Sequence, residues 1–151
     1  MKAGRRMTMV RCLFLAALAW ISVVGGCGAR QPLAPVDGIV TLDGQPLGNV
    51  LVVFVPDGSG GPVSRATGIA DAAGRFELKT EDGRLGAAVG SYRIVVEDLA
   101  LQDAPRDPDG TILVMPPTRI PDRYASTLTT TAAAQVEQGR RPMKVELSSG
   151  P

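Results

Sequence analysis

Short segments in which apolar and polar residues alternate recur along the chain after its first 35 residues. A period of two places successive side chains on opposite faces of a β-strand, so each segment predicts a half-buried strand. One segment is apolar throughout, at 50–55, and predicts a central strand that is covered on both faces. The predicted strands span residues 36–42, 50–55, 66–70, 75–79, 92–97 and 143–147.

Turn signals separate these strands. Asp43-Gly44 is a strong hairpin sequence, and both Gly44 and Gly74 supply the positive φ that tight turns need. Residues 56–62 are rich in glycine and proline and predict a loop. No long segment between the strands has the apolar period of a helix. The chain is therefore expected to be all-β, an antiparallel β-sandwich of about seven strands.

Two segments are ambiguous. Residues 98–121 contain five prolines and an apolar patch, Ile112–Met115, and they are too long for an ordinary hairpin loop, which indicates an insertion between strands. The β-branched residues of Leu128–Thr131 favour a strand. Residues 132–138 fit either a strand or a short helix that ends at Gly139. The strand is favoured because the end of this segment also suits a turn into the last strand.

The first 26 residues have the composition of an export signal. Basic residues precede a 13-residue apolar stretch at 12–24, which is followed by small residues. This stretch is too short to span a bilayer of about 30 Å as a helix. The pattern therefore indicates a secretory signal peptide at 1–26. Its basic residues are Lys2, Arg5, Arg6 and Arg11.

The signal sequence leads into Val24-Gly25-Gly26-Cys27, which resembles the bacterial lipobox of an aliphatic residue, small residues and a cysteine. In lipoproteins the cysteine sulfur receives a diacylglyceryl group, the preceding peptide is removed, and the new amine is acylated, commonly with palmitate. The resemblance implies cleavage between Gly26 and Cys27, a lipidated tether at 27–35 and a domain at 36–148. Two alternatives stay open, namely an ordinary signal peptide in which Cys27 plays no part and an uncleaved membrane anchor.

Composition narrows the possible functions. The chain has 151 residues, which fits one domain, and 16 Lys and Arg against 15 Asp and Glu. Without the leader, 12 basic and 15 acidic residues remain, and this mildly acidic balance argues against nucleic acid as a partner. Removing Cys12 with the leader and capping Cys27 with lipid would leave no disulfide. The absence of histidine excludes Ser-His-Asp chemistry and His-ligated zinc.

The segments 38–47, 52–56, 71–76 and 90–96 together resemble the carboxypeptidase regulatory-like, or transthyretin-like, domain. Its pattern combines G-x-V-x-x-x-G-x-P-L, a T-D-x-x-G-x-F hairpin and G-x-Y-x-V. The segment 120–129, with I-P-x-x-Y followed by S-x-L-T, resembles a signature of small lipoproteins that are abundant in planctomycete bacteria. The resemblance implies a transthyretin-like sandwich with packing roles for its tyrosines: Tyr92, like a tyrosine corner, and Tyr124, over a sandwich edge.

Catalytic chemistry is not expected. The resemblance is to an accessory domain of carboxypeptidases, and the zinc ligands of a catalytic domain have no counterpart here. Hydroxyl nucleophiles are present, but no base and orienting group accompany them. Asp107, Asp109 and Gly110 fit part of a calcium loop, although the neighbouring prolines and the missing distant acid favour a solvated turn. No cofactor and no metal are therefore expected.

The remaining hypothesis is a non-catalytic structural or protein-interaction module, lipid-anchored to the cell envelope through Cys27. Open sheet edges and Ile112–Met115 are its expected contact surfaces. The alternative is a module that binds carbohydrate or another small ligand, although the few aromatics after the leader fall at inward or motif positions. The partner is then an envelope protein or a glycan. Gly28 follows Cys27 where some bacteria use aspartate for inner-membrane retention, which favours the outer membrane or the periplasmic face.

Overall fold

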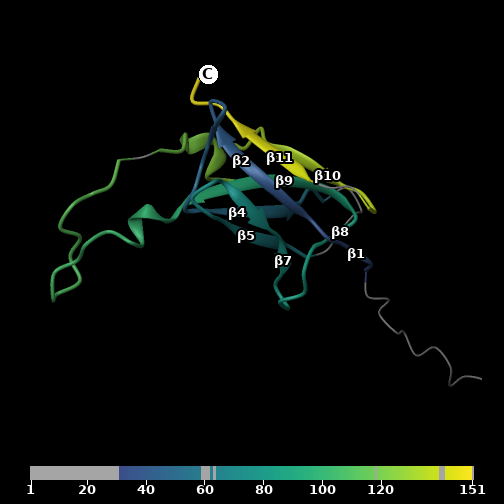
Figure 1. Cartoon of the computed structure of the whole chain (residues 1–151), viewed down its shortest axis with the longest axis horizontal. Helices are drawn as coiled ribbons and strands as arrows, with labels where there is room; N and C mark the ends of the chain where they lie inside the picture. The colour runs from purple at the N-terminus through teal and green to yellow at the C-terminus, as the bar shows by residue number, and fades with distance from the viewer. Residues whose placement is uncertain (1–30, 59–61, 63, 118, 140–141, 151) are drawn as a thin grey trace, which may run out of the picture. The chain divides into compact units, whose positions relative to one another are not determined.

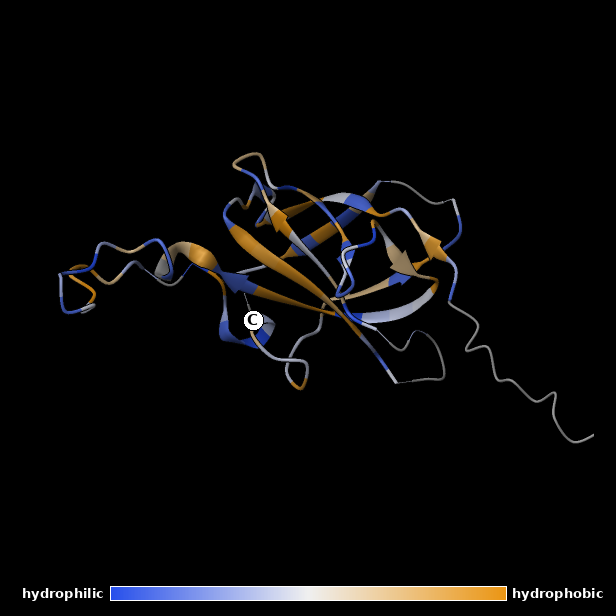
Figure 2. Ribbon diagram, turned by 90° about the horizontal axis from the view of Figure 1, so that it is seen from below, coloured by the Kyte–Doolittle hydropathy of each residue, from blue (hydrophilic) through white to orange (hydrophobic). Residues whose placement is uncertain are grey.

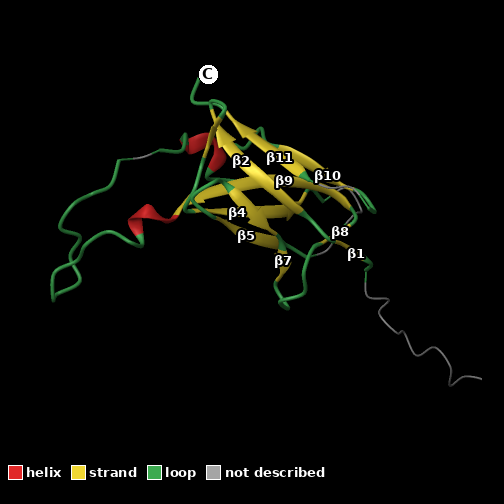
Figure 3. Ribbon diagram, viewed as in Figure 1, coloured by secondary structure: helices red, strands yellow, loops and turns green. Residues whose placement is uncertain are grey.

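The computed structural model describes residues 31–58, 62, 64–117, 119–139 and 142–150. This part of the chain is all-β, as predicted, with strands joined by turns, two short 3-10 helices and no α-helix (Figure 3). The 3-10 helices are η2 (Leu99–Leu101) and η3 (Asp122–Tyr124). The strands are β1 (Leu33–Ala34), β2 (Asp37–Leu42), β3 (Gln45–Pro46), β4 (Val50–Pro56), β5 (Ala66–Ala70), β6 (Arg75–Glu77), β7 (Lys79–Thr80), β8 (Ala87–Ala88), β9 (Gly90–Asp98), β10 (Ala133–Val136) and β11 (Met143–Leu147).

Two sheets face each other across a shared core (Figure 1). One has five strands in the order β10-β9-β4-β5-β7 and is antiparallel throughout. The other is built on β2, which pairs with β11, β3 and β6. The prediction of a wholly antiparallel sandwich is wrong in one place, because β11 runs parallel to β2 with Val145 opposite Val40. The chain therefore crosses from β10 in one sheet to β11 in the other instead of forming a hairpin.

Aromatic rings fill the space between the sheets. The Phe54 ring centroid on β4 lies 6.3 Å from that of Phe76 on β6 and 5.7 Å from that of Tyr92 on β9. Tilted pairs at such distances are favourable because the positive edge of one ring meets the negative face of another. Alternate apolar residues of β2, β9 and β11 complete the core, as their period predicts. They include Val40, Ile94, Val96, Val145 and Leu147.

The segment 75–79 has the predicted alternation, with Phe76 and Leu78 buried between exposed polar residues. It is nevertheless two strands, because β6 pairs with β2 in one sheet and β7 pairs with β5 in the other. Leu78 lies at the crossing, where its N–H donates to Val36 O at 2.9 Å and its carbonyl accepts from Gly86 N at 2.7 Å. Such a corner strand joins the two sheets through one continuous backbone.

Both predicted tight turns are confirmed. Asp43 and Gly44 have φ of 50° and 79°, and they join β2 to β3 with Leu42 opposite Gln45. Positive φ at both central residues is the twist-matched geometry of a two-residue hairpin. Gly74 has φ of 74° in the turn between β5 and β6. These turns set the register of the sheets, and the register places the apolar side chains on the core face.

The strand favoured for residues 132–138 is confirmed, since Ala133–Val136 form β10. Two other predictions need correction. Leu128–Thr131 is a turn and not a strand, because Ser126 accepts the Leu128 N–H on its hydroxyl at 3.2 Å and the Thr130 N–H on its carbonyl at 2.9 Å. Local bonds of this kind compete with strand pairing. The strand β4 is central as predicted, yet on its outward face only Val53 is buried and its neighbours are partly exposed.

The expected signal peptide at 1–26, the cleavage site at Gly26 and the lipid site at Cys27 lie outside the described residues. The fold begins before Val36, since Leu33 and Ala34 at the end of the predicted tether pair with β8. Ala34 is fully buried. Within the described ranges, no helix has the length and apolar character needed to cross a bilayer.

Candidate interaction site

The predicted insertion is a long arm, residues 99–121, between β9 and η3. The arm leaves the sheets and extends away from them (Figures 1 and 2). Its outer part is a hairpin in which Arg106 forms a β-bridge with Ile112. The carboxylate of Asp107 accepts the N–H of Asp109 at 3.0 Å and the N–H of Thr111 at 2.8 Å. The segment Asp107–Gly110 is therefore the predicted Asp-Pro-Asp-Gly turn, with the Asp107 side chain stabilising its own backbone.

This geometry bears on the partial calcium motif. One oxygen of Asp107 is already an acceptor for two backbone N–H groups. Within the part of the chain that the structure describes, no group of three or more His, Cys, Asp or Glu side chains is placed to hold a metal ion. Asp107 thus acts as a turn residue in this geometry.

The apolar patch of the arm is the most exposed group of neighbouring large apolar side chains among the described residues. Leu113, Val114 and Met115 are 62%, 64% and 71% exposed. The Leu113 N–H donates to Pro105 O at 2.8 Å, so the patch lies on the returning side of the hairpin. Figure 2 shows apolar residues in the distant part of the arm, separated from the apolar strands of the sheets. Consecutive apolar side chains held away from a core are typical of a contact surface.

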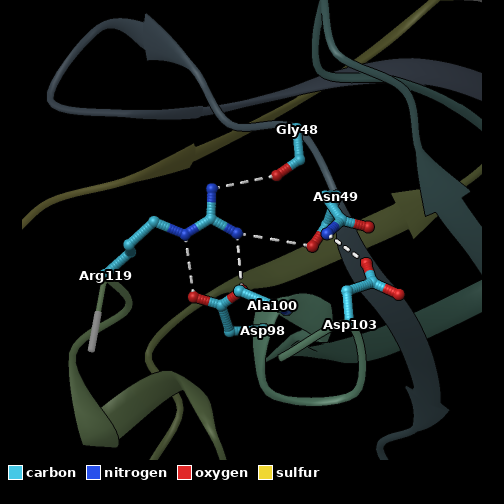
Figure 4. Close-up of polar contacts among 6 residues, drawn as sticks. All are labelled: Gly48, Asn49, Asp98, Ala100, Asp103 and Arg119. Carbon is cyan, nitrogen blue, oxygen red and sulfur yellow. Dashed lines mark hydrogen bonds and ion pairs between the residues drawn. The ribbon is translucent and has the colours of Figure 1, made fainter. Parts of the chain in front are cut away.

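An ion pair closes the base of the arm (Figure 4). Arg119 donates from Nε to one carboxylate oxygen of Asp98 at 2.9 Å and from Nη2 to the other at 2.5 Å. Asp98 ends β9 directly before the arm and Arg119 lies near the end of the arm, so this fork joins the two ends of the insertion. The side chains are 20% and 35% exposed, respectively. A bidentate pair of this kind fixes orientation as well as distance.

The loop before β4 holds the ion pair against the sheet. The Arg119 guanidinium also donates to Gly48 O at 3.2 Å and to Asn49 O at 3.4 Å. Asn49 has φ of 57°, and its side-chain amide donates to Asp103 at 2.9 Å (Figure 4). The Asp98 carboxylate also accepts the Ala100 N–H at 3.0 Å, and this hydrogen bond caps the N-terminus of η2. We call Gly48, Asn49, Asp98, Asp103 and Arg119 the arm clamp.

The arm clamp changes the ionisation of its own members. Hydrogen bonding to Arg119 lowers the pKa of Asp98, against the opposing effect of burial. The Asp98 carboxylate in turn raises the pKa of Arg119. Each group thus stabilises the charged form of the other. Sequence reasoning missed this cluster because its members come from three separate segments and belong to no motif.

The tyrosines singled out in the sequence have packing roles. The buried Tyr92 hydroxyl donates to Ala88 O at 2.9 Å, four residues earlier, as the tyrosine-corner prediction required. Burial raises the pKa of Tyr92 to about 12. Tyr124 is buried, its hydroxyl accepts the Ser148 N–H at 3.2 Å, and Arg123 lies 4.9 Å from its ring centroid. With Phe54 and Phe76 in the core, all aromatic side chains that the structure describes are buried.

A scan against protein-family models, a search of curated proteins and a search of solved structures each found no match to this chain.

Proposed function

We propose that this protein is a lipid-anchored module of the bacterial cell envelope, attached through Cys27, which contacts an envelope protein with the apolar patch of its arm and does no catalysis. The observation that carries the proposal is the arm itself. An exposed apolar patch lowers the solubility of a protein, and here the ion pair and further hydrogen bonds of the arm clamp hold the base of the arm that carries it. An apolar patch that is exposed in this way is suited to burial against a partner protein.

The direction of the arm supports a partner away from the anchoring membrane. In Figure 1 the strand β1, where the chain enters the fold from the predicted tether, lies at the right of the sheets, and the arm extends to their left. A lipid on Cys27 would hold the β1 end close to the bilayer. Two or three acyl chains make such anchoring stable, whereas one chain is marginal. The proposal also includes membership of the transthyretin-like family and a location in the cell envelope, and both rest on the sequence motifs described above.

The alternative function, binding of carbohydrate, has a weaker basis. A polar groove of about 610 Å³ lies along β9 and β10, and its lining includes Asp57, Ser91, Arg93 and Gln135. The Ser91 hydroxyl already donates to Gln135 at 2.6 Å, and Arg93 donates to Thr127 O at 3.2 Å. Glycan sites usually add an exposed aromatic platform, and the described aromatics are all buried. A glycan array with the protein tests this alternative.

Cys27→Ser should abolish acyl labelling and release the protein from the membrane fraction. Serine lacks the nucleophilic thiolate that receives the lipid. The measurement is metabolic labelling with a fatty-acid analogue, followed by fractionation of the producing cells. Cys12→Ser makes the same change inside the leader and should leave both labelling and retention at wild-type levels. Unchanged membrane retention of Cys27→Ser would contradict the anchoring part of the proposal.

Replacing Leu113, Val114 and Met115 with serine should remove the partner from crosslinked envelopes, because the contact loses its apolar side chains. Burial of each such side chain is worth about 1.5–3 kcal/mol, so the loss of three should reduce recovery by more than tenfold. Ile69→Ser is the matched control, since Ile69 is 64% exposed on β5 outside the arm. If the triple variant recovers the same partner as wild type, the arm is not the contact surface.

A further inference from the structure

Two methionines carry all the sulfur in the part of the chain that the structure describes. Cysteine and tryptophan, whose side chains are also readily oxidised, do not occur among the described residues. Met143 on β11 is partly buried and packs against the core. Met115 in the arm is 71% exposed, so small solutes can reach its side chain. A reagent that oxidises thioethers should therefore react first at Met115.

Met115 also belongs to the apolar patch with which the arm is proposed to contact its partner. It follows Leu113 and Val114, which are 62% and 64% exposed. A thioether suits a contact surface because it is apolar and polarisable, and its three rotatable bonds let it adapt to the partner. Of the three side chains, only that of methionine changes from apolar to polar on mild oxidation.

We propose that Met115 is a modification site, at which oxidation by a peroxide weakens the contact between the arm and its partner. The peroxide transfers one oxygen atom to the thioether sulfur. The sulfur loses two electrons and becomes a sulfoxide, and hydrogen peroxide is reduced to water. This inference rests on the proposed function of the arm and adds a means of regulating the same contact.

The sulfoxide weakens the contact because of its polar S=O group. Water solvates this group in the free protein, whereas binding would bury it among apolar side chains, and burial without a hydrogen-bond donor is unfavourable. The change is reversible, since a sulfoxide reductase removes the oxygen as water with two electrons from a pair of thiols, which become a disulfide. The proposed envelope location favours the oxidation, because the thiol systems that keep the cytosol reducing are absent there.

The first experiment measures the oxidation of purified protein by hydrogen peroxide in the absence of a partner. Mass spectrometry of proteolytic peptides should show addition of oxygen several-fold faster at Met115 than at Met143, because packing against the core shields the Met143 thioether. Circular dichroism should show that the protein stays folded, since the arm extends away from the sheets (Figure 1). Equal rates at the two methionines would overturn Met115 as the preferred site.

The second experiment measures how oxidation changes the recovery of the partner. Purified protein is oxidised, freed of peroxide and added to envelopes from cells that lack it, so that the partner itself is never oxidised. After crosslinking, recovery should fall about tenfold relative to untreated protein, which corresponds to one polar group buried without a partner. Treatment of the oxidised protein with a methionine sulfoxide reductase and dithiothreitol should restore recovery.

Two leucine variants assign the effect to one sulfur atom. Leucine is similar in size to methionine and has no thioether. Met115→Leu should therefore give the same recovery before and after peroxide, whatever its untreated level. Met143→Leu is the matched control and should respond to peroxide as wild type does. A loss of recovery on oxidation of Met115→Leu, or no loss on oxidation of wild type, overturns the inference.

The variant with serine in place of Leu113, Val114 and Met115 separates this inference from the proposed function. If that variant recovers the partner as well as wild type does, the proposed function fails. If it loses the partner while oxidised wild type retains it, the arm is the contact surface, and oxidation of Met115 does not regulate the contact.

Discussion

Gly74→Ala should lower the free energy of unfolding by about 3 kcal/mol, the upper part of the range for a single overpacked site. Two effects add at this position. A left-handed φ of 74° is strained for alanine, and an added Cβ would lie 2.5 Å from Val40 O. Val40 O already accepts the Leu47 N–H, and the Val40 N–H donates to Gly74 O at 2.8 Å. The neighbouring atoms are backbone, so the turn must move and these bonds must weaken.

Gly44→Ala is the matched control for this prediction. Gly44 has a similar φ of 79°, but nothing lies within 4 Å of its added Cβ. Only the left-handed strain then applies, and the expected loss is about 1 kcal/mol. Denaturant unfolding of both variants, with the tyrosine signal or circular dichroism as readout, measures the difference. Equal losses would mean that the close approach of Gly74 to Val40 has no energetic consequence.

The same pair of glycines shows which features of the fold could be predicted from the sequence. Asp43-Gly44 and the turn that ends at Gly74 were predictable, because short-range dihedral preferences decide them. The contact of Gly74 with Val40 was not predictable, since it depends on pairing between β2 and β6. Strand positions followed from the period-two pattern for a similar local reason. The passage of the chain from one sheet to the other at Leu78 could not be predicted in this way, because the alternation along a strand is the same whichever sheet the strand joins.

The parallel pairing of β11 with β2 and the arm clamp could not be predicted from the sequence, and the reason is the same for both. Met143–Leu147 has the alternation of any edge strand, and its pattern does not encode the direction of its neighbour. Asp98 and Arg119 are separated by an arm of irregular backbone, so neither spacing nor a motif connects them. The apolar patch at Ile112–Met115 was visible in the sequence, whereas the arm clamp at the base of the arm was not. Interactions between distant segments thus account for what was missed.

Arg119→Leu should loosen the arm and lower the free energy of unfolding by about 1–2 kcal/mol. This is the typical contribution of a hydrogen-bonded charge pair, reduced because both side chains are partly exposed to solvent. The leucine leaves the Asp98 carboxylate without its bidentate partner and Gly48 O without a donor. Trypsin cleavage after Arg106, in the hairpin of the arm, should then be several-fold faster, because local opening becomes easier. Removing the exposed Asp82–Arg84 ion pair by Asp82→Asn should leave the cleavage rate at the wild-type level.

The stability difference between wild type and Arg119→Leu should also depend on pH. Arg119 lowers the pKa of Asp98 below its ordinary value of 3.8, so the folded state favours the ionised carboxyl. The resulting stabilisation is fully present above that ordinary value and is lost as the pH falls through the lowered pKa of the folded state. Unfolding curves from neutral pH to below pH 3.8 should therefore converge at the acid end. Curves that stay parallel would show that the ion pair contributes nothing, and that Arg119 acts only through its bonds to Gly48 and Asn49.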